Sequence, residues 1–418
     1  MIAPPITPNK AGHGELESPY AWWRLAAALL ISTLGGVGMW SVVVVLPTVQ
    51  AEFGVARADA SLPYTLNMIM FGLGGILMGR LSDRFGVMVA VIAGALALGA
   101  GYLVAGASAG IGQFALVQGL LIGVGTSATF APLLADTSHW FTRRRGIAVA
   151  IVASGNYLAG AIWPPVVQHF VETVGWRQTY FGIGLVCLAG MLPLALVLRR
   201  RLPPHDPVVA GSAAAALMER PLGLSPNALL ALLAIASFAC CMAMSMPQVH
   251  IVAYCGDLGY GAARGAQMLS VMLACGVVSR LIFGFICDRI GGLRTLLLGS
   301  GLQGVALLLF LPFDGLVSLY VISALFGLFQ GGIVPSYAII VREHFPPEEA
   351  GARVGTVLMF TLFGMALGGW MSGKVFDLTG SYHAAFLNGI GWNLLNVSIA
   401  SFLLLRLYRL RRVAVATA

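Results

Sequence analysis

The stretch GRLSDRFG at residues 79–86 recurs as GFICDRIG at residues 284–291, an offset of 205 residues in a chain of 418. Each copy follows the second long apolar stretch of its half of the chain, so the order of apolar stretches repeats together with the motif. Repeats of this kind are typical of membrane proteins built from two similar halves. The pair of motifs therefore predicts two halves of like construction.

Composition places the chain in a membrane. Apolar residues make up 58% of the sequence and charged residues only 10%, against roughly 25% charged residues in ordinary soluble domains. Such a chain cannot cover a water-facing surface, which argues against a soluble enzyme. One pass of about 20 apolar residues plus a connector uses ~30 to 35 residues, so the length corresponds to about a dozen passes.

Apolar runs and the residues that interrupt them predict twelve transmembrane helices and hence an all-α membrane protein with two pseudo-symmetric six-helix bundles. The expected spans are 24–48, 62–81, 87–106, 112–138, 147–171, 179–198, 227–255, 265–287, 294–312, 317–341, 355–375 and 384–406. The corresponding domains are a disordered tail (1–22), an N-terminal bundle (23–198), a linker (199–226), a C-terminal bundle (227–406) and a second tail (407–418).

The basic residues indicate the orientation of the chain. With both termini in the cytoplasm, Arg57, Arg177, Arg264 and Lys374 fall on the outer side and Arg280 within a span, leaving 19 of the 24 Lys and Arg residues inside. An excess of this kind on one side follows the positive-inside rule and predicts this orientation. We expect a multi-pass protein of a bacterial inner membrane. The net charge of +8 stands in short clusters between spans, so we expect the lipid bilayer, and not nucleic acid, as its partner.

The repeated pattern G-x-x-x-D-R-x-G resembles the signature loop of the major facilitator superfamily, and the resemblance covers essentially the whole chain. In that family the loop is structural and controls opening on the cytoplasmic side. The resemblance therefore implies a gating role for Asp83, Arg84, Asp288 and Arg289. No phosphate-binding loop of the form G-x-x-x-x-G-K-[ST] is present, so transport driven by ATP is disfavoured.

A narrower resemblance begins at Trp140, where WFTRRRGIAVAIVASGNYLAGAIWPP runs to Pro165. This stretch is similar to the fifth-span signature of the monocarboxylate transporter family, whose relatives include bacterial carriers of oxalate and formate. It implies a small organic anion as substrate. Two features depart from the family: residues 35–40 lack its first-span acid, and Gly276 stands where its eighth span carries an aspartate, so its proton relay does not carry over.

Arg280 is the one charged residue expected deep within a span. A guanidinium there costs at least ~2.5 to 3.5 kcal/mol on insertion scales, and each of the sixteen acids falls in a connector or near a span end. A carboxylate fits a forked guanidinium through two parallel hydrogen bonds. We therefore expect Arg280 to bind an anionic substrate in a water-filled cavity; backbone carbonyls, snorkelling or a gate ion pair are the alternatives.

His250 is the candidate for proton coupling. It follows Pro247, which should bend the outer part of its span, and a histidine titrates near neutrality. It lies about ten residues, or ~15 Å, outward of the centre of its span. A proton entry point or outer gate is therefore more plausible than direct contact with the substrate, and a satisfied interfacial histidine is the alternative.

Further polar residues lie deep enough in their spans to line the same cavity, or to join helices instead. They are Asn67, Gln118, Asn156, Tyr157, Gln303, Gln330, Tyr337, Asn388 and Asn393. The six cysteines show no C-x-x-C spacing, so we expect no disulfide framework, no metal and no cofactor.

These features together predict a secondary active transporter that moves a small monocarboxylate-like anion by alternating access, with proton symport. Exchange of one anion for another is the close alternative. A drug or lipophilic-cation exporter is disfavoured because no acid is expected at mid-membrane, and a sensor because the linker is too short to form a signalling domain. No catalytic constellation appears in the spans, so an enzyme is not expected. We expect a working monomer.

Overall fold

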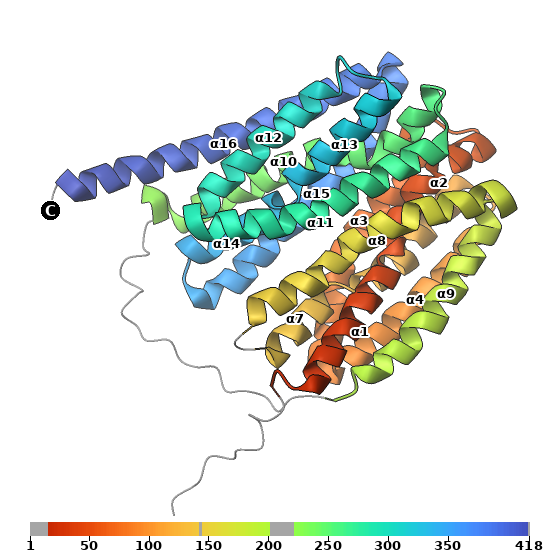
Figure 1. Ribbon diagram of the computed structural model, residues 1–418, viewed down its shortest axis with the longest axis horizontal. Coiled ribbons are helices and arrows are strands. Elements are labelled where there is room, and N and C mark those ends of the chain that lie inside the picture. The colour runs from red at the N-terminus through yellow and green to blue at the C-terminus, as the bar shows by residue number, and fades with distance from the viewer. Residues whose placement is uncertain (1–15, 142–143, 201–220, 417–418) are drawn as a thin grey trace, which may run out of the picture.

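The computed structural model describes residues 16–141, 144–200 and 221–416. These residues are almost entirely helical and include no strand. Twelve helical segments among them are long and apolar enough to cross a membrane, which confirms the predicted count. Figure 1 shows the helices running roughly side by side in two groups.

The first six spans form the N-terminal bundle. Its elements are α1 (Pro19–Gly35), α2 (Val37–Phe53), α3 (Arg57–Phe85), α4 (Val87–Gly106), α5 (Ile111–Val117), the π-helical η2 (Gln118–Gly123), α6 (Val124–Ser127), α7 (Ala131–Trp140), α8 (Arg145–Val174) and α9 (Trp176–Val197). The C-terminal bundle consists of η4 (Pro221–Gly223), α10 (Pro226–Asp257), α11 (Ala262–Ile290), α12 (Gly292–Leu309), α13 (Leu316–Gln330), α14 (Ile333–His344), α15 (Pro347–Thr379) and α16 (Tyr382–Ala416).

The first helix begins earlier than predicted. Ser18 accepts a hydrogen bond from the backbone N–H of Ala21 at 3.3 Å, and Pro19 follows at the first helical position. A serine cap followed by proline is a strong start signal, so residues 19–22 are helical where a disordered tail was predicted. Residues 1–15 of that tail lie outside the described residues.

A serine cap followed by proline also begins α10, the first long helix of the C-terminal bundle. Ser225 accepts from the N–H of Ala228 at 3.3 Å, and Pro226 is the first helical residue of α10. The linker was predicted at 199–226, and its residues 201–220 lie outside the described residues. The turn η4 occupies part of the remainder.

The last helix ends later than predicted. α16 runs to Ala416, ten residues beyond the predicted end of the span, so most of the expected tail at 407–418 is helical. At 1.5 Å per residue its 35 residues span about 52 Å. Figure 1 shows this helix projecting beyond the rest of the bundle.

The two signature loops have the same backbone geometry. α3 ends at Gly86 with φ 89° and ψ 156°, and α11 ends at Gly291 with φ 84° and ψ 163°. This conformation is essentially restricted to glycine, so each motif specifies a sharp reversal into the next span. The end of the molecule that carries residues 79–86 and 284–291 is called the motif end below, and the other is called the opposite end.

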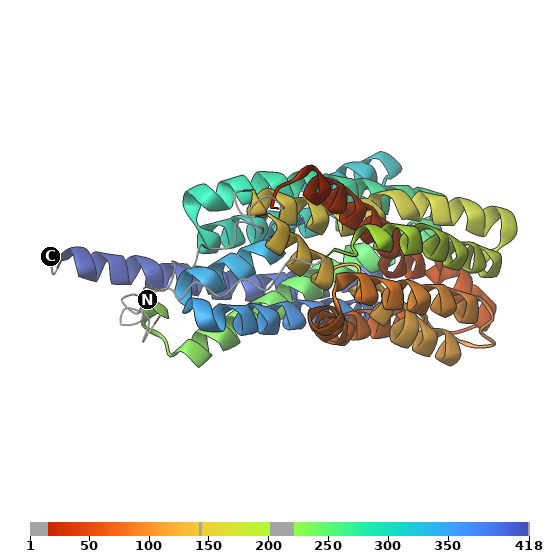
Figure 2. The same cartoon turned by 90° about the horizontal axis from the view of Figure 1, so that it is seen from below.

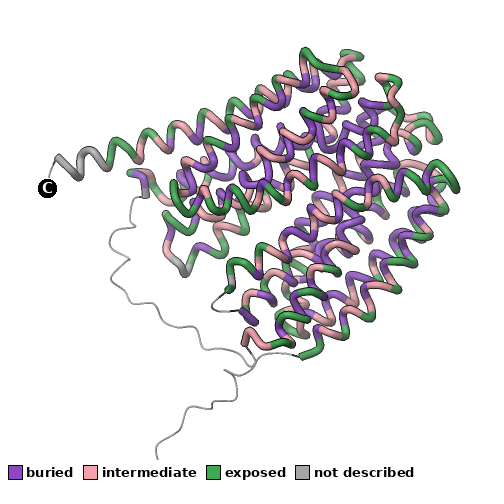
Figure 3. The backbone as a smooth tube through the Cα atoms, in the orientation of Figure 1, coloured by how far each residue is buried: buried purple, intermediate pink, exposed green. Residues whose placement is uncertain are grey.

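Helix pairs from different bundles contact one another across the centre of the molecule. α3 packs against α15, α8 against α11, and α2 against α10, and Figure 2 shows the bundles from a second direction. Figure 3 shows buried residues between the helices and exposed residues on the outside. Many exposed side chains are large and apolar, including Leu185 at 60% and Val317 at 76% exposure. Such surfaces are suited to lipid, so the chain is a multi-pass integral membrane protein.

Candidate substrate cavity

A cavity of about 390 Å³ lies between the two bundles. The N-terminal bundle lines it with Met39, Trp40, Met68, Phe71, Gly72, Gly75, Ile76, Ser127, Phe130, Ala131, Asn156 and Tyr157. The C-terminal bundle lines it with Cys241, Met244, Gln248, Leu273, Arg280, Val334, Gly355, Leu358, Met359, Thr361, Leu362 and Met365. The cavity is therefore shared between the bundles, and Arg280 is its one charged lining residue among the described residues.

Arg280 reaches the cavity from α11 and is held by groups of the other bundle. Its Nη1 donates to the carbonyl oxygen of Ala153 in α8 at 3.1 Å, and its Nε is buried without a hydrogen-bond partner. The guanidinium carbon lies 4.2 Å from the ring centre of Tyr157. No carboxylate of the described residues forms an ion pair with it. Within the described part of the chain, its charge is thus met by a carbonyl dipole and an aromatic face.

Gly276 makes room for the ring of Tyr157. A Cβ atom at Gly276 would lie 2.4 Å from the Tyr157 ring, closer than any real contact. Gly276 is one turn before Arg280 on α11, so the space that an acidic side chain would need is filled by this ring. The absence of an acid at position 276, noted from the sequence, is thus matched by an aromatic ring stacked on the arginine.

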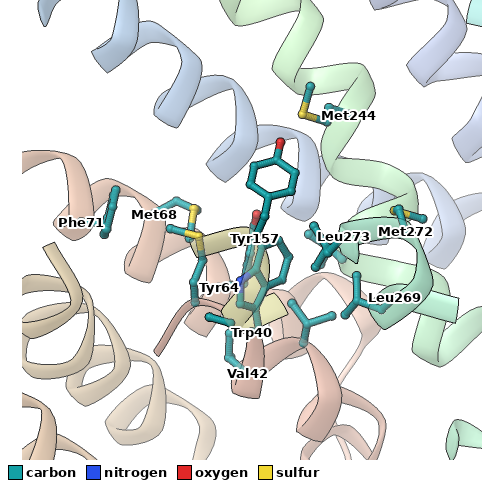
Figure 4. Packing of buried hydrophobic residues seen from close by; sticks show 14 of the residues in the cluster. Trp40, Val42, Tyr64, Met68, Phe71, Tyr157, Met244, Leu269, Met272 and Leu273 are labelled. Carbon is teal, nitrogen blue, oxygen red and sulfur yellow. The ribbon is translucent and has the colours of Figure 1, made fainter. Parts of the chain in front are cut away.

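Asn156 and Trp40 form a second polar contact on the cavity wall. The indole Nε1 of Trp40 donates to the backbone oxygen of Asn156 at 3.1 Å and to its Oδ1 at 3.2 Å. The Nδ2 of Asn156 points to the Met39 sulfur at 3.5 Å. These bonds satisfy the polar atoms inside the wall. Figure 4 shows the rings of Trp40 and Tyr157 between Met68 and Leu273.

Gln248 lines the cavity but was not predicted. It follows Pro247 in α10 and donates from Nε2 to Oε1 of Gln330 at 2.8 Å. Gln330, which was predicted to line the cavity, is the buried partner behind it. The signal was present in the sequence MPQVH, because the polar residue next to the proline is closer to mid-membrane than His250.

The structure brings only Arg280, Asn156 and Tyr157 of the ten predicted substrate contacts into the cavity lining. The other seven form contacts elsewhere between helices. Asn67 and Gln118 both donate to Gly38 O, Gln303 donates to Cys240 O, Gln330 accepts from Gln248, Tyr337 donates to Asn396, Asn388 points to the Met371 sulfur, and Asn393 donates to Ser300 O. In this conformation these residues join helices, which was the alternative interpretation.

His250 is fully buried and does not line the cavity. One ring nitrogen, Nε2, lies 2.8 Å from the carbonyl oxygen of Gly369 in α15, and Nδ1 has no hydrogen-bond partner. Gly369 in turn packs against the ring of Tyr64 in α3. The histidine therefore lies where α10, α15 and α3 meet, toward the opposite end.

Polar contacts hold the bundles together at the opposite end. Arg57 at the start of α3 donates to Asp257 at 3.0 Å and to the hydroxyl of Tyr382 at 2.6 Å. The carboxylate of Asp377 accepts from the backbone N–H groups of Arg57 and Ala58 at 2.9 and 2.8 Å. Asp257, Asp377 and Tyr382 belong to the C-terminal bundle. This cluster, called the Arg57 clamp, joins the two bundles at that end.

The signature-loop charges are exposed at the motif end. Asp83 and Asp288 form no ion pair among the described residues. Arg84 lies over Phe85 and Arg289 over Phe285 on their own helices. A separate cavity of about 420 Å³ lies beside Arg289 within the C-terminal bundle. Because that cavity touches only one bundle, it does not belong to the central path.

Two bundles of membrane-spanning helices around a shared cavity are the architecture of a membrane transporter. A family model of the Major Facilitator Superfamily matches residues 28–318 and 268–417. The chain therefore belongs to the major facilitator superfamily, as its signature loops predict.

Similar proteins from animals and fungi are named as transporters. Monocarboxylate transporter 13 of Bos taurus is 29% identical over 389 residues, which cover 91% of this chain and 87% of that protein. The MFS-type transporter opdF of Penicillium oxalicum is 26% identical, over 87% of this chain and 83% of that protein. The crystal structure of a mutant of the nucleoside transporter NupG matches with a TM-score of 0.73 and 16% identity, covering 92% of this chain and 99% of that one. This last likeness concerns the fold alone.

Proposed function

We propose that the chain is a secondary active transporter that moves a monocarboxylate-like organic anion across a bacterial inner membrane by alternating access, acting as a monomer. The observation that carries the proposal is the position of Arg280 in a cavity shared by both bundles, without a carboxylate partner among the described residues. A charge in such a place needs a counterion, and the substrate is the candidate.

The chemistry of the guanidinium supports an anion with a planar carboxylate. Nη1 is occupied by the Ala153 carbonyl and one face by Tyr157, and the buried Nε has no hydrogen-bond partner that a bound anion would displace. Arginine binds carboxylates through paired, charge-assisted hydrogen bonds. The similarity to monocarboxylate transporter 13 supports the same class of substrate.

The positions of the Arg57 clamp and of the cavity support the proposal that this structure is the inward-open form of the transporter. The Arg57 clamp lies at the opposite end, whereas the cavity lining reaches Ile76 and Gly355, toward the motif end. If the positive-inside orientation holds, the motif end and both termini are cytoplasmic. The signature-loop residues Asp83, Arg84, Asp288 and Arg289 would then meet in the outward-open form.

Proton symport through His250 is the proposed coupling. His250 lies below the Arg57 clamp with an unpartnered Nδ1, a position that opening of the clamp would bring into contact with the outer solution. Anion exchange is the second candidate. It is favoured by the absence of histidine and carboxylate side chains from the described cavity lining. Because the described cavity lining has no carboxylate to bind a cation, it gives no support to a carrier of cationic drugs.

Thermal stabilisation of the purified protein by carboxylates tests the anion site. We expect a carboxylate to stabilise the parent protein, Arg280→Lys to weaken that effect because a point charge cannot replace the planar fork, and Arg280→Ala to abolish it. Arg264→Lys is the matched control, because Arg264 lies on the same helix but outside the cavity. Equal stabilisation of the parent and Arg280→Ala would exclude Arg280 from the site.

Reconstituted vesicles distinguish the two kinds of coupling. A pH gradient is applied to vesicles that contain no internal anion. Proton symport predicts accumulation of the labelled carboxylate, and obligate exchange predicts none until an internal anion is supplied.

A further inference from the structure

The lining of the central cavity is rich in methionine, and these residues are called the methionine wall below. Five methionines line the cavity, from both bundles: Met39, Met68, Met244, Met359 and Met365. Methionine side chains are flexible and polarizable, and their sulfurs make favourable contacts with aromatic rings. Such a wall adapts to a large apolar group, whereas a formate-sized anion makes no use of it.

Two aromatic rings stand beside the methionines. Trp40 and Tyr157 lie close together in Figure 4, with Met68 on one side and Leu273 on the other. The Trp40 N–H is already bonded to Asn156, so the indole offers its ring and not a free donor. Flat aromatic surfaces pack well against another ring in offset or edge-to-face geometry.

The charge of the cavity matches one carboxylate and no more. Arg280 is the one charged residue in the described lining. A second carboxylate on the substrate would find no second cation in a mainly apolar lining, and an unpaired charge in such surroundings is strongly disfavoured. The volume, about 390 Å³, falls in the ~300 to 1,000 Å³ range of sites for ligands much larger than formate.

We propose that the cargo is a monocarboxylate with a bulky apolar body, aromatic or branched, and that oxalate-like dicarboxylates are excluded. This inference rests on the proposed function and narrows its substrate class. The carboxylate binds at Arg280, and the body lies against Trp40, Tyr157 and the methionine wall.

Three probes that all contain an acetate group test the inference on the purified, full-length protein. Acetate has no body, phenylacetate adds a ring, and 4-carboxyphenylacetate adds a second charge to that ring. Burying a phenyl-sized group predicts that phenylacetate binds about 10- to 100-fold more tightly than acetate. The dicarboxylate should lose most of that gain.

A matched pair of variants tests the wall itself. Met68→Gln keeps the size of a side chain in the cavity lining but makes it polar, and should weaken phenylacetate binding about tenfold while leaving acetate binding unchanged. Met88→Gln, outside the cavity on α4, should change neither. Met244→Gln replaces Met68→Gln if that variant does not fold, and acetate binding that depends on Arg280 reports an intact site in either case.

The outcomes separate this inference from the proposed function. If acetate or the dicarboxylate binds as tightly as phenylacetate, and binding requires Arg280, the bulky-body inference is wrong and the anion carrier stands. The same holds if Met68→Gln weakens acetate and phenylacetate equally. If none of the three probes binds, both proposals are overturned.

Discussion

The guanidinium of Arg280 lies 4.2 Å from the ring centre of Tyr157, on a helix of the other bundle. The ring covers one face of the guanidinium and leaves its Nε without a hydrogen-bond partner. A cation on an aromatic face gains about 0.5 to 2 kcal/mol, depending on how far it is desolvated. Tyr157 is therefore a positioning residue for the arginine.

The first prediction concerns that ring. Tyr157→Leu should weaken carboxylate binding about 3- to 30-fold, the range set by loss of the cation–π contact. Tyr157→Phe keeps the ring and should bind nearly as well as the parent. Titration calorimetry with one carboxylate measures both variants. Equal losses in the two would assign the effect to the hydroxyl instead.

The second prediction concerns Gly276. Gly276→Ala places a methyl group where the Tyr157 ring now lies, so the ring must move off the arginine and binding should fall as in Tyr157→Leu. The double variant Gly276→Ala/Tyr157→Leu should bind the carboxylate no more weakly than Tyr157→Leu alone, because both changes remove the same ring contact. Gly284→Ala, on the same helix with open space around it, is the control. Additive losses would contradict a shared mechanism.

The third prediction concerns the Arg57 clamp. Asp257→Asn removes the charge that pairs with Arg57, whose side chain is only 7% exposed. Charge-assisted hydrogen bonds contribute about 1.5 to 3 kcal/mol, so the ratio of closed to open form should fall at least about tenfold.

Labelling of a cysteine measures that shift. Ser61, fully buried one turn after Arg57, becomes the reporter as Ser61→Cys in a background without the native cysteines. Asp257→Asn should raise its labelling rate. Asp314→Asn, an exposed acid at the same end, should not. An unchanged rate in Asp257→Asn would remove the clamp from the control of opening.

The fourth prediction concerns stability. Arg24 of α1 is 3% exposed and makes two hydrogen bonds, of 2.9 and 2.7 Å, to Asp136 of α7. Asp136→Asn leaves that cation without its partner and should cost about 3 to 5 kcal/mol. The melting temperature should fall by several degrees while carboxylate affinity at a permissive temperature stays unchanged. Arg24→Met combined with Asp136→Leu should recover much of the loss.

The fifth prediction concerns His250. Under symport, His250→Gln should abolish accumulation driven by a pH gradient while preserving exchange of labelled for unlabelled anion. The glutamine keeps a polar group near the Gly369 carbonyl but carries no titratable proton. Accumulation at the parental rate would exclude His250 as the coupling group and assign proton coupling to another residue.

Much of the fold could be predicted from the sequence because the repeated motifs and the apolar lengths are strong signals. Gly86 and Gly291 adopt the same positive-φ conformation, so the two loops that predicted the repeat also form equivalent turns. Span ends were less well predicted. The caps at Ser18 and Ser225 are local hydrogen bonds, and hydropathy does not detect them.

The site was predicted only in part because sequence gives the depth of a residue in the membrane but not its direction around the helix. Arg280 could be found because a buried charge is costly at any orientation. Asn67 and Gln118 lie at suitable depths, yet both donate to the carbonyl of Gly38 within their own bundle. Their helices are apolar on every side, so no polar face indicated which residues meet the cavity.

The length of α16 makes the C-terminal end of the chain a suitable place to attach a reporter domain. Its 35 residues extend about 52 Å, whereas the hydrocarbon layer is about 30 Å thick. Roughly 20 Å of helix therefore extends beyond the hydrocarbon layer. A fluorescent domain fused after Ala418 would follow a helix that projects beyond the rest of the bundle. It would report on which side of the membrane the chain ends without obstructing the path of the solute.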